Sequence, residues 1–226
     1  MPDKMHEKTE SGDRLMVLLE GNIGAGKTTV GKAIVAAGAF GFIEEPTAAW
    51  REDFASNMLD HLYSDIARWA FTFQICTFIT RAKNWTEIAA RTDHWRVVLE
   101  RSIFCDRFVF MENFYRTGVV QQVEYQLYCG LWDFATANYD VQPDLILYLR
   151  TPAEVCLQRI KERGRVEESG IELDYLLQLE GLHDEWLLDG GDSRVAVLDG
   201  ERRWSTKDIL AEVEAAVVSK GFAKII

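Results

Sequence analysis

Short apolar runs alternate along the chain with longer segments of helical period, and this pattern predicts an α/β fold. Five runs are rich in Leu, Ile and Val and lack polar alternation, which is typical of strands covered on both faces. These candidate strands are residues 15–20, 42–44, 97–99, 144–149 and 195–198. Because such strands form parallel sheets with flanking helices, we expect three layers around a five-stranded parallel sheet.

Helices are expected between these strands. The longest runs from residue 65 to about residue 91, where apolar and aromatic side chains recur at helical spacing. Pro152 is placed to open a helix at its first turn. The other expected helices are residues 27–37, 104–116, 123–139 and 206–219. Ligands of such sheets bind beyond the carboxyl ends of the strands, so the informative residues should follow each strand.

Composition narrows the class of protein. The net charge of −11 over 226 residues argues against nucleic-acid binding through a broadly basic surface. No apolar run approaches the ~20 residues of a membrane helix, and the four cysteines lack metal-ligand spacing. We therefore expect a soluble, cytoplasmic protein with reduced thiols and no membrane or nucleic-acid partner. Residues 1–14 are polar with mixed charge and predict a disordered tail, followed by one domain over residues 15–226.

A glycine-rich segment directly follows the first expected strand and opens the first expected helix. Its sequence, GNIGAGKT at residues 21–28, satisfies the pattern G-x-x-x-x-G-K-S/T. Backbone N–H groups and the helix N-terminus bind phosphate oxygens there, the lysine reaches the outer phosphates, and the hydroxyl can ligate Mg²⁺. The expected phosphate-binding residues are Gly21, Asn22, Ile23, Gly24, Ala25, Gly26, Lys27, Thr28 and Thr29. The guanine-reading pattern N-K-x-D is absent, which argues against a switch GTPase.

Charged residues follow the next two strands. Glu44 and Glu45 come after the second strand, and a carboxylate there could accept a proton from an attacking hydroxyl group. Glu100 and Arg101 come after the third strand, where they could position Mg²⁺ and neutralise developing phosphoryl charge.

Several motifs in order resemble those of the deoxyribonucleoside kinases, the family of deoxycytidine, deoxyguanosine and mitochondrial-type thymidine kinases and the insect multisubstrate enzyme. They are EGNIGAGKTT, EEPTAAW, RWAFTFQ with an arginine seven residues beyond the glutamine, ERSIFCDRF and RIKERGRVEESGIELDYL. The resemblance covers about residues 15–188. It implies a P-loop kinase fold, a homodimer, and transfer from ATP–Mg²⁺ to the 5′-hydroxyl of a 2′-deoxyribonucleoside in nucleotide salvage.

The resemblance also implies roles for the residues that match these motifs. Glu45 resembles the general base that polarises the 5′-hydroxyl, and Arg101 the arginine that contacts the 5′-oxygen and the phosphoryl group. Lys27 completes the catalytic set, and Thr28 with Glu100 is the expected metal site. A lid at about residues 159–170 supplies three arginines that close over the donor phosphates: Arg159, Arg163 and Arg165.

The nucleoside pocket is implied in the same way. Tyr63 and Glu168 resemble the pair that holds the 3′-hydroxyl, and Gln74 resembles the amide that makes two hydrogen bonds to the base edge. The other positions that the resemblance gives to the substrate are Trp50, Leu59, Phe73, Thr77, Arg81, Asp106 and Phe110, of which Trp50, Phe73 and Phe110 are aromatic walls.

The base preference depends on Arg81 and Asp106. In the family this charged pair marks the deoxycytidine and deoxyguanosine kinase branch, and it would have to be desolvated against the 5-methyl group of thymine. We therefore predict deoxyadenosine, deoxyguanosine or deoxycytidine over thymidine. Thr77 and the stretch MENFYRTG at residues 111–118 resemble the thymidine branch and leave the ranking open.

Two other functions remain open at this stage. A nucleoside monophosphate kinase, such as one similar to thymidylate kinase, would share the phosphate cradle, the sheet and a lid, and Asp106-Arg107-Phe108 resembles its D-R-Y/F motif. That motif lies beyond the strand end, where Glu100 and Arg101 stand instead. A non-catalytic P-loop protein that only binds nucleotide is the second alternative. The loop for the donor base is expected near residues 199–204.

Overall fold

A parallel sheet organises the computed structural model, which describes residues 14–36, 40–52, 54–89, 95–139, 142–202 and 205–221. The sheet has five strands in the order β2-β3-β1-β4-β5, and every neighbouring pair is parallel. The strands are β1 (Arg14–Glu20), β2 (Gly41–Ile43), β3 (Trp95–Glu100), β4 (Leu145–Arg150) and β5 (Val195–Asp199). The predicted fold class and all five predicted strands are therefore confirmed.

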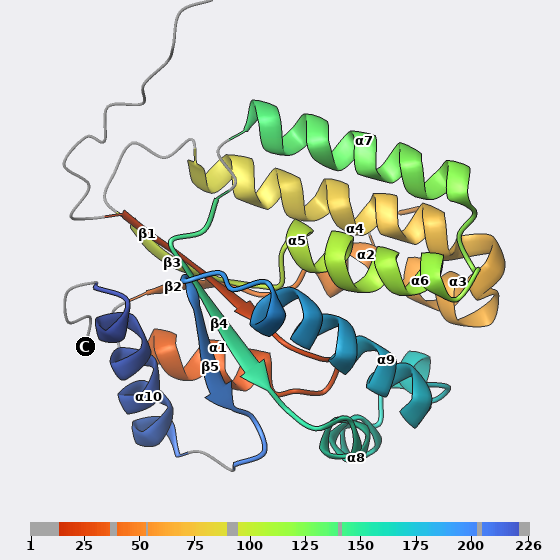
Figure 1. Cartoon of the computed structure of the whole chain (residues 1–226). Coiled ribbons are helices and arrows are strands. Elements are labelled where there is room, and N and C mark those ends of the chain that lie inside the picture. Colours follow the sequence, from red (N-terminus) through yellow and green to blue (C-terminus); the bar gives the residue numbers. More distant parts are fainter. Residues whose placement is uncertain are drawn as a thin grey trace, which may run out of the picture.

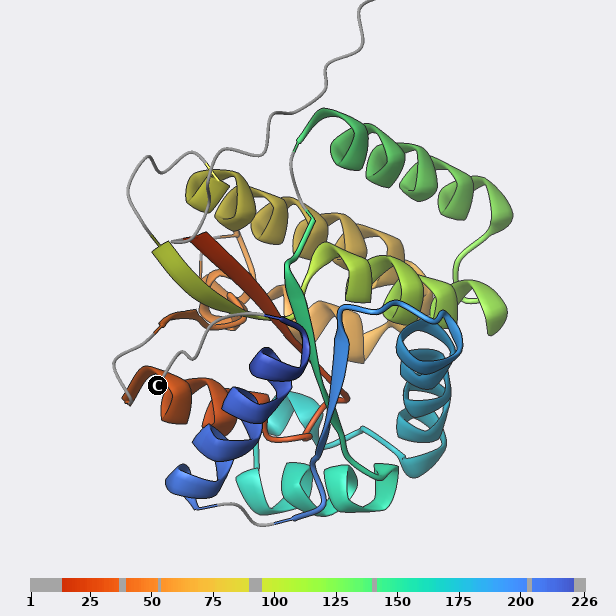
Figure 2. The ribbon, with the colours of Figure 1, turned by 60° about the vertical axis from the view of Figure 1, so that its left-hand side comes forward.

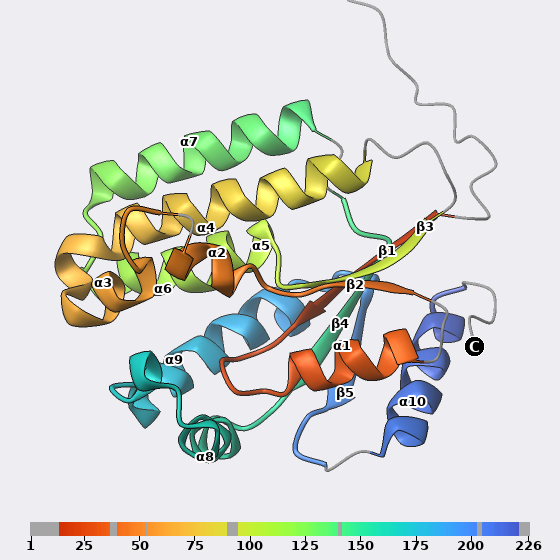
Figure 3. The same ribbon diagram turned by 180° about the vertical axis from the view of Figure 1, so that it is seen from behind.

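Helices cover both faces of the sheet, as Figures 1 and 3 show. On one side lie α4 (Ile66–Ala89) and α7 (Gln122–Asn138), and on the other lie α1 (Lys27–Ala36) and α10 (Thr206–Ser219). The shorter elements are α2 (Thr47–Glu52), α3 (Met58–Ser64), α5 (Ile103–Cys105), η1 (Asp106–Met111), α6 (Glu112–Arg116), α8 (Ala153–Arg163), η2 (Val166–Glu168), α9 (Leu173–Asp184) and η3 (Glu185–Asp189). Within the described ranges, none of these helices combines the length and the apolar character needed to cross a membrane.

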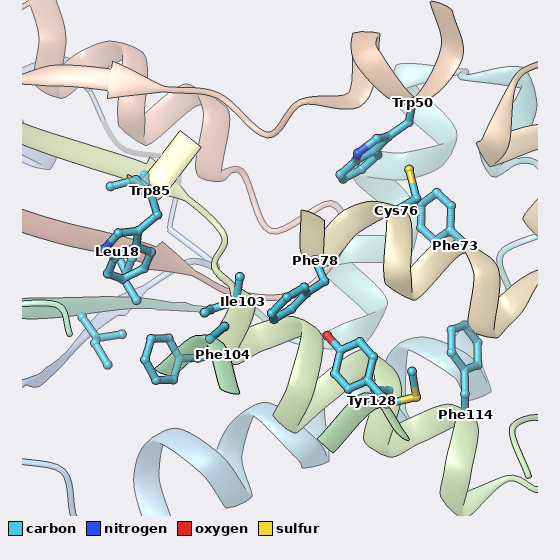
Figure 4. Close-up of a cluster of buried hydrophobic side chains, with 14 of the residues drawn as sticks. Leu18, Trp50, Phe73, Cys76, Phe78, Trp85, Ile103, Phe104, Phe114 and Tyr128 are labelled. Carbon is cyan, nitrogen blue, oxygen red and sulfur yellow. The ribbon is translucent and has the colours of Figure 1, made fainter. Parts of the chain in front are cut away.

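Aromatic side chains dominate the core on the α4 side of the sheet (Figure 4). Phe78 of α4 meets Tyr128 of α7 edge to face, with ring centroids 5.8 Å apart, and Phe104 meets Trp132 in the same way at 5.8 Å. Such pairs add about 0.5–1.5 kcal/mol each to the burial of their surface. They hold α7 against α4 and α5 and so help to fix α4, the helix that carries much of the site.

The segment expected as one helix over residues 104–116 is divided. It consists of α5, the π-helical turn η1 and α6. A π turn inserts extra backbone into a helix and is frequent at functional sites. Here η1 carries Asp106 and Phe110, both of which line the cavity described below.

Five of the described helical elements were not predicted, namely α2, α3, α9, the 3₁₀ turn η2 and the π turn η3. Short helices such as α3 depend on local caps, and the Asn57 side chain accepts hydrogen bonds from the N–H groups of Leu59 at 3.0 Å and Asp60 at 3.3 Å. In α9 the spacing of Leu173, Leu176 and Leu179 is helical, so a signal was present. The expected tail lies outside the described residues except for the backbone of residue 14, and so do residues 203 and 204 of the expected donor-base loop.

Candidate active site

A cavity opens at the carboxyl ends of β1, β2 and β3 and encloses about 1100 Å³, including its mouth. Figure 2 shows the same edge of the sheet with α8 following β4. The phosphate loop and the lid both reach this cavity. All residues that the sequence assigns to the substrate line it: Glu45, Trp50, Leu59, Tyr63, Phe73, Gln74, Thr77, Arg81, Arg101, Asp106, Phe110 and Glu168. Their individual roles stay predictions.

The phosphate loop between β1 and α1 depends on glycine at two close approaches. Gly21 and Gly24 have φ angles of +147° and +78°, which favour glycine. A Cβ atom on Gly21 would lie 2.6 Å from the carbonyl oxygen of Leu149, and one on Gly24 would lie 2.6 Å from that of Cys156. The loop can therefore pack against β4 and α8 only with these glycines.

Lys27 bridges the ends of this loop. Its Nζ donates to the carbonyl oxygens of Gly21 at 3.0 Å and Asn22 at 2.8 Å. Burial, followed by the positive charge of Arg101, lowers the pKa of Lys27 to about 8. The ammonium group is therefore poorly compensated here and well placed to gain from an anionic phosphate group.

Side chains of two expected cradle residues point elsewhere. Asn22 Nδ2 donates to the carbonyl oxygen of Leu176 at 2.9 Å, which ties the loop to α9. Thr29 is exposed on the surface of α1. Only the backbone of these two residues remains as a candidate phosphate contact.

Thr28 and Glu100 come together across the loop and the end of β3. The Thr28 hydroxyl group lies 2.9 and 3.0 Å from the two carboxylate oxygens of Glu100. A hydroxyl and a carboxylate are hard oxygen ligands, and Mg²⁺ in nucleotide sites takes few protein ligands alongside phosphates and water. No group of three or more His, Cys, Asp or Glu side chains suited to a metal occurs among the described residues. The pair therefore fits Mg²⁺ bound together with nucleotide phosphates.

The two adjacent acids after β2 have different surroundings. Both line the cavity, but Glu44 is about half exposed and pairs with Lys32 at 3.0 Å. Glu45 turns into the cavity, where its Oε1 forms ion pairs with Arg81 and with Nε of Arg101, the latter at 2.9 Å. Burial opposes ionisation of Glu45, but the charges of Arg101 and Arg81 outweigh it and lower its pKa. Glu45 is thus an ionised carboxylate at neutral pH.

Arg101 has an unusual backbone conformation. Its φ of +65° is the only positive value among the non-glycine residues that the structure describes. Such a conformation costs on the order of 1–3 kcal/mol and persists where the surroundings impose it. Here the backbone N–H of Arg101 donates to the carbonyl oxygen of Leu19 at 3.1 Å, and the guanidinium lies over Phe110, 4.7 Å from the ring centroid. The strained turn aims the guanidinium into the cavity.

At the far end of the cavity, buried polar atoms lack partners. Gln74 and Asp106 are 2% and 1% exposed. Arg81 pairs with Asp106 as well as with Glu45, and its guanidinium lies 5.1 Å from the Trp50 ring centroid. Gln74 Oε1, Asp106 Oδ2 and Arg81 Nε have no hydrogen-bond partner within the described part of the chain. Because such groups are costly to leave unpaired, they point to a polar ligand.

Aromatic rings flank this polar end. Trp50 and Phe73 meet edge to face with centroids 5.4 Å apart. Trp50 Nε1 donates to Thr80 Oγ1 at 3.0 Å, and the Thr77 hydroxyl donates to the carbonyl oxygen of Gln74 at 3.0 Å. The indole N–H of Trp50 and the hydroxyl of Thr77 are therefore both hydrogen-bonded to residues of α4. The rings of Trp50 and Phe73 present flat apolar surfaces to the cavity.

The lid arginines fall into two groups. Arg159 Nη1 donates to the carbonyl oxygen of Ala25 in the phosphate loop at 2.8 Å, and its Nη2 lies 3.4 Å from that of Glu201. Arg163 and Arg165 instead pair with Glu168 at 2.5 and 3.2 Å. The expected lid thus carries its own counterion, and in this structure these two arginines neutralise Glu168.

Sequence reasoning missed several residues of the cavity, and three of them are polar residues on α2 and α9. Tyr175 of α9, Arg51 and Thr47 of α2 all line it. Arg51 Nε lies 2.8 Å from Glu167 of η2, so it connects α2 to the lid. The helical spacing around Tyr175 was the available signal for α9. Arg51 and Thr47 gave no such signal, because an arginine and a threonine near Trp50 are equally compatible with an exposed surface and with a binding site.

Glu20, at the end of β1, is fully buried below the cavity. The Ser102 hydroxyl donates to its Oε1 at 2.5 Å, and its Oε2 has no partner among the described residues. Burial raises the pKa of Glu20 to about 7, although Ser102 and the charge of Arg101 act in the opposite direction. The folded protein therefore holds a proton that the unfolded chain releases near its ordinary pKa of 4.5.

This predicts a pH-dependent stability. Between pH 4.5 and about 7 the folded state binds more protons at Glu20 than the unfolded state does, so the contribution of Glu20 to stability falls as the pH rises. The loss should be about 3 kcal/mol, and Glu20→Gln should abolish it. Urea unfolding of both proteins at about pH 5 and about pH 7.5 measures the difference. Equal pH dependence in the two proteins would contradict the assignment.

Comparison with known proteins finds similar sequences over most of the chain. A family model described as deoxynucleoside kinase matches residues 17–219. Thymidine kinase 2, mitochondrial, of Homo sapiens is 38% identical over 189 residues, which cover 84% of this chain and 69% of that protein. Deoxycytidine kinase of Mus musculus is 34% identical over 196 residues, covering 76% and 75%. Deoxycytidine kinase 2 of Gallus gallus is 31% identical over 195 residues, covering 76% and 74%.

These matches bear on the alternatives that the sequence left open. They support phosphoryl transfer to a nucleoside over transfer to a nucleoside monophosphate, and the family is one of P-loop kinases with the observed type of sheet. The chain belongs to the deoxynucleoside kinase family, whose members are ATP-dependent phosphotransferases.

Proposed function

We propose that this protein transfers the γ-phosphoryl group of ATP to the 5′-hydroxyl of a 2′-deoxyribonucleoside. One observation carries the proposal: a single cavity extends from Lys27 and Thr28 of the phosphate loop, past Glu45, to the unpartnered amide oxygen of Gln74. A nucleoside with its base at Gln74 and its 5′-carbon at Glu45 would face the nucleotide phosphates directly. Arg159 and residues 199–202 would lie on the donor side, since Arg159 contacts both the loop and Glu201.

Catalysis in this arrangement consists of positioning and charge neutralisation. Glu45 accepts a hydrogen bond from the 5′-hydroxyl and takes its proton as the new bond to phosphorus forms. A weakly basic carboxylate suffices, because the hydroxyl becomes acidic late in a loose transition state. Arg101 and Lys27 neutralise charge on the transferred group. Mg²⁺ held by Thr28 and Glu100 would neutralise charge on the donor phosphates when bound.

Glu168 would exchange partners during the reaction. In the structure it pairs with Arg163 and Arg165, and it shares the cavity with Tyr63. Burial and the charges of Glu168 and Glu45 raise the pKa of Tyr63, so its hydroxyl stays protonated as a donor. We propose that Tyr63 and Glu168 hold the 3′-hydroxyl, which leaves the lid arginines available to the donor phosphates.

The base end favours deoxyadenosine, deoxyguanosine or deoxycytidine over thymidine. The free acceptors Gln74 Oε1 and Asp106 Oδ2 match the exocyclic amino group of cytosine or adenine, and Arg81 Nε can donate to the carbonyl of guanine. Thymine presents a carbonyl and a methyl group at this edge, and the methyl group would lie against the charged pair. The relatives include enzymes named for thymidine and for deoxycytidine, so the preference rests on this geometry.

The test is a steady-state panel of the four deoxynucleosides and their monophosphates with ATP and Mg²⁺. Phosphorylation of deoxycytidine or a purine deoxynucleoside ahead of thymidine is the expected result. Turnover of the monophosphates alone would instead establish a nucleoside monophosphate kinase. Nucleotide binding without turnover of any acceptor would establish a non-catalytic P-loop protein.

We also propose that the protein is a homodimer through the outer surface of α4 and α7. Val123, Leu127 and Phe134 lie on one face of α7 and are 63%, 63% and 60% exposed. Ile79 on α4 is 56% exposed, and Figure 1 shows the two helices side by side. Large exposed apolar side chains gathered on neighbouring helices support protein–protein contact.

Two charges on this face should separate the subunits. The double variant Leu127→Glu, Phe134→Glu should sediment as a monomer, because each carboxylate would have to be desolvated in the interface. The wild type should sediment at twice the monomer mass. Val218→Glu, at a similarly exposed position of α10, is the matched control and should leave the dimer intact. A monomeric wild type would exclude the proposal. Cytoplasmic localisation remains a prediction, since the human relative is named as mitochondrial.

A further inference from the structure

The guanidinium of Arg101 is held on three sides. Its Nε contacts Glu45 at 2.9 Å, and its face lies over Phe110. On the third side Nη1 lies 3.4 Å from Sγ of Cys105. Glu45 and Phe110 line the cavity. Cys105 is fully buried behind the cavity, at the end of α5, the helical turn that precedes η1.

The contact with Cys105 continues into a chain of buried polar groups. Cys105 Sγ lies 3.6 Å from Nε2 of His183, and Nδ1 of His183 lies 2.7 Å from the carbonyl oxygen of Leu179. A guanidinium can only donate and a carbonyl oxygen can only accept, so both ends of the chain have a fixed direction. The order is therefore Arg101 to Cys105, Cys105 S–H to His183 Nε2, and His183 Nδ1–H to Leu179.

Cys105 and His183 have the protonation states that this order of hydrogen bonds requires. Burial, followed by the positive charge of Arg101, lowers the pKa of His183 to about 3, so the imidazole is neutral and Nε2 carries a lone pair. Burial raises the pKa of the Cys105 thiol, so the S–H donor persists. The His183 ring is also fixed by stacking on Tyr148, with centroids 5.9 Å apart and planes inclined by 5°.

Position matters at Arg101 because its backbone conformation is strained and its side chain acts at the transferred phosphoryl group under the proposed function. With Nε and one N–H of Nη1 engaged within the described residues, Nη2 keeps both of its N–H donors for a phosphoryl oxygen. We propose that Cys105 and His183 are positioning residues, which hold the Arg101 guanidinium in register with the phosphoryl group through α9. This inference rests on the proposed function for its kinetic consequence but not for its geometry.

Kinetics of a double-mutant cycle provide the first test. Cys105→Ala should lower kcat about tenfold and change the nucleoside KM by less than about twofold, since it removes an acceptor from a charged donor. Cys105→Ser, which keeps a donor and an acceptor, should stay within about threefold of the wild type. In an Arg101→Lys background, which lacks Nη1, Cys105→Ala should change kcat by less than about twofold.

Additive effects in this cycle would overturn the proposal, because a residue that only packs the core would lower kcat equally in both backgrounds. Cys156→Ala is the matched control, since Cys156 is equally buried and lies on α8. It should reproduce any stability loss without the selective loss of kcat. Should Cys105→Ala not fold, His183→Phe keeps the stacked ring, removes the acceptor and should show the same dependence on Arg101.

A measurement without turnover separates this proposal from the proposed function. The two Nη groups of Arg101 should give distinct ¹⁵N signals in the wild type, because its guanidinium cannot rotate, and Arg101→Lys assigns them by their loss. In Cys105→Ala they should broaden and merge. Unchanged signals would overturn the positioning role. The protein could also phosphorylate no nucleoside and still show two distinct Arg101 ¹⁵N signals that merge in Cys105→Ala. That result would refute only the proposed function.

Discussion

Glu45→Gln should lower kcat by about 10²–10³ while the dissociation constant for the deoxynucleoside stays within about threefold of the wild type. Gln keeps the shape and an acceptor oxygen, but it cannot take the proton of the 5′-hydroxyl. It also compensates less of the charge of Arg81 and Arg101, which the Glu45 carboxylate pairs in the structure. Steady-state kinetics with calorimetric binding of the nucleoside separate the two effects.

The neighbouring acid is the matched control for this variant. Glu44 is about half exposed and pairs with Lys32, so Glu44→Gln should keep kcat within about twofold of the wild type. A thermal melt of Glu45→Gln should show a modest loss of stability from the two under-compensated arginines. Loss of nucleoside binding as large as the loss of kcat would instead make Glu45 a structural residue.

The double variant Arg81→Met, Asp106→Ala should raise the ratio of kcat/KM for thymidine to that for deoxycytidine by at least about 10². It removes the charged pair that a 5-methyl group would otherwise have to approach, and it removes the free acceptor that matches the cytosine amino group. Deoxycytidine should therefore lose efficiency while thymidine gains it. Competition between the two nucleosides measures the ratio directly.

A single variant tests whether the charged pair of Arg81 and Asp106 is the physical reason for the preference. Arg81→Met alone leaves the carboxylate of Asp106, which is 1% exposed, without its ion-pair partner, and it should be the least stable of the set by about 3–5 kcal/mol. Removing both partners should restore most of that stability. Lys83→Met on the exposed side of α4 should change neither the ratio nor the stability. An unchanged thymidine ratio in a folded double variant would contradict the steric account.

Much of the fold and of the candidate site could be predicted before any coordinates. The central strands, the phosphate loop and α4 depend on local composition and period, and all three are as expected. The edge strands β2 and β5 form where expected but are only partly buried. Helix α3, by contrast, follows from one Asn57 cap, and the π turn η1 depends on packing that local sequence does not express. The candidate site residues could be found because they belong to recognisable sequence motifs. Nothing in the sequence around Arg51 indicated that it lines the cavity.

Partnerships between charged groups were beyond the reach of sequence. Nothing in the order of residues shows that Arg81 would share Glu45 with Arg101, or that Arg163 and Arg165 would pair with Glu168. Nor does it show that Cys105 would link Arg101 to His183, which lies 78 positions away along the chain. The contacts of Glu45 and of Cys105 join elements that only the packed sheet brings together, whereas the two pairs with Glu168 are local and depend on the turn between α8 and η2.

By itself, the amino-acid sequence determined the parallel sheet, the phosphate loop and the chemical types present at each strand end, because burial period and glycine conformation are local properties. The tertiary structure alone decided which carboxylate meets the buried arginines and which acceptors stay free for a base. Those choices depend on distances between side chains from β2, β3, α4 and η1, and electrostatic and hydrogen-bond energies are set by such distances.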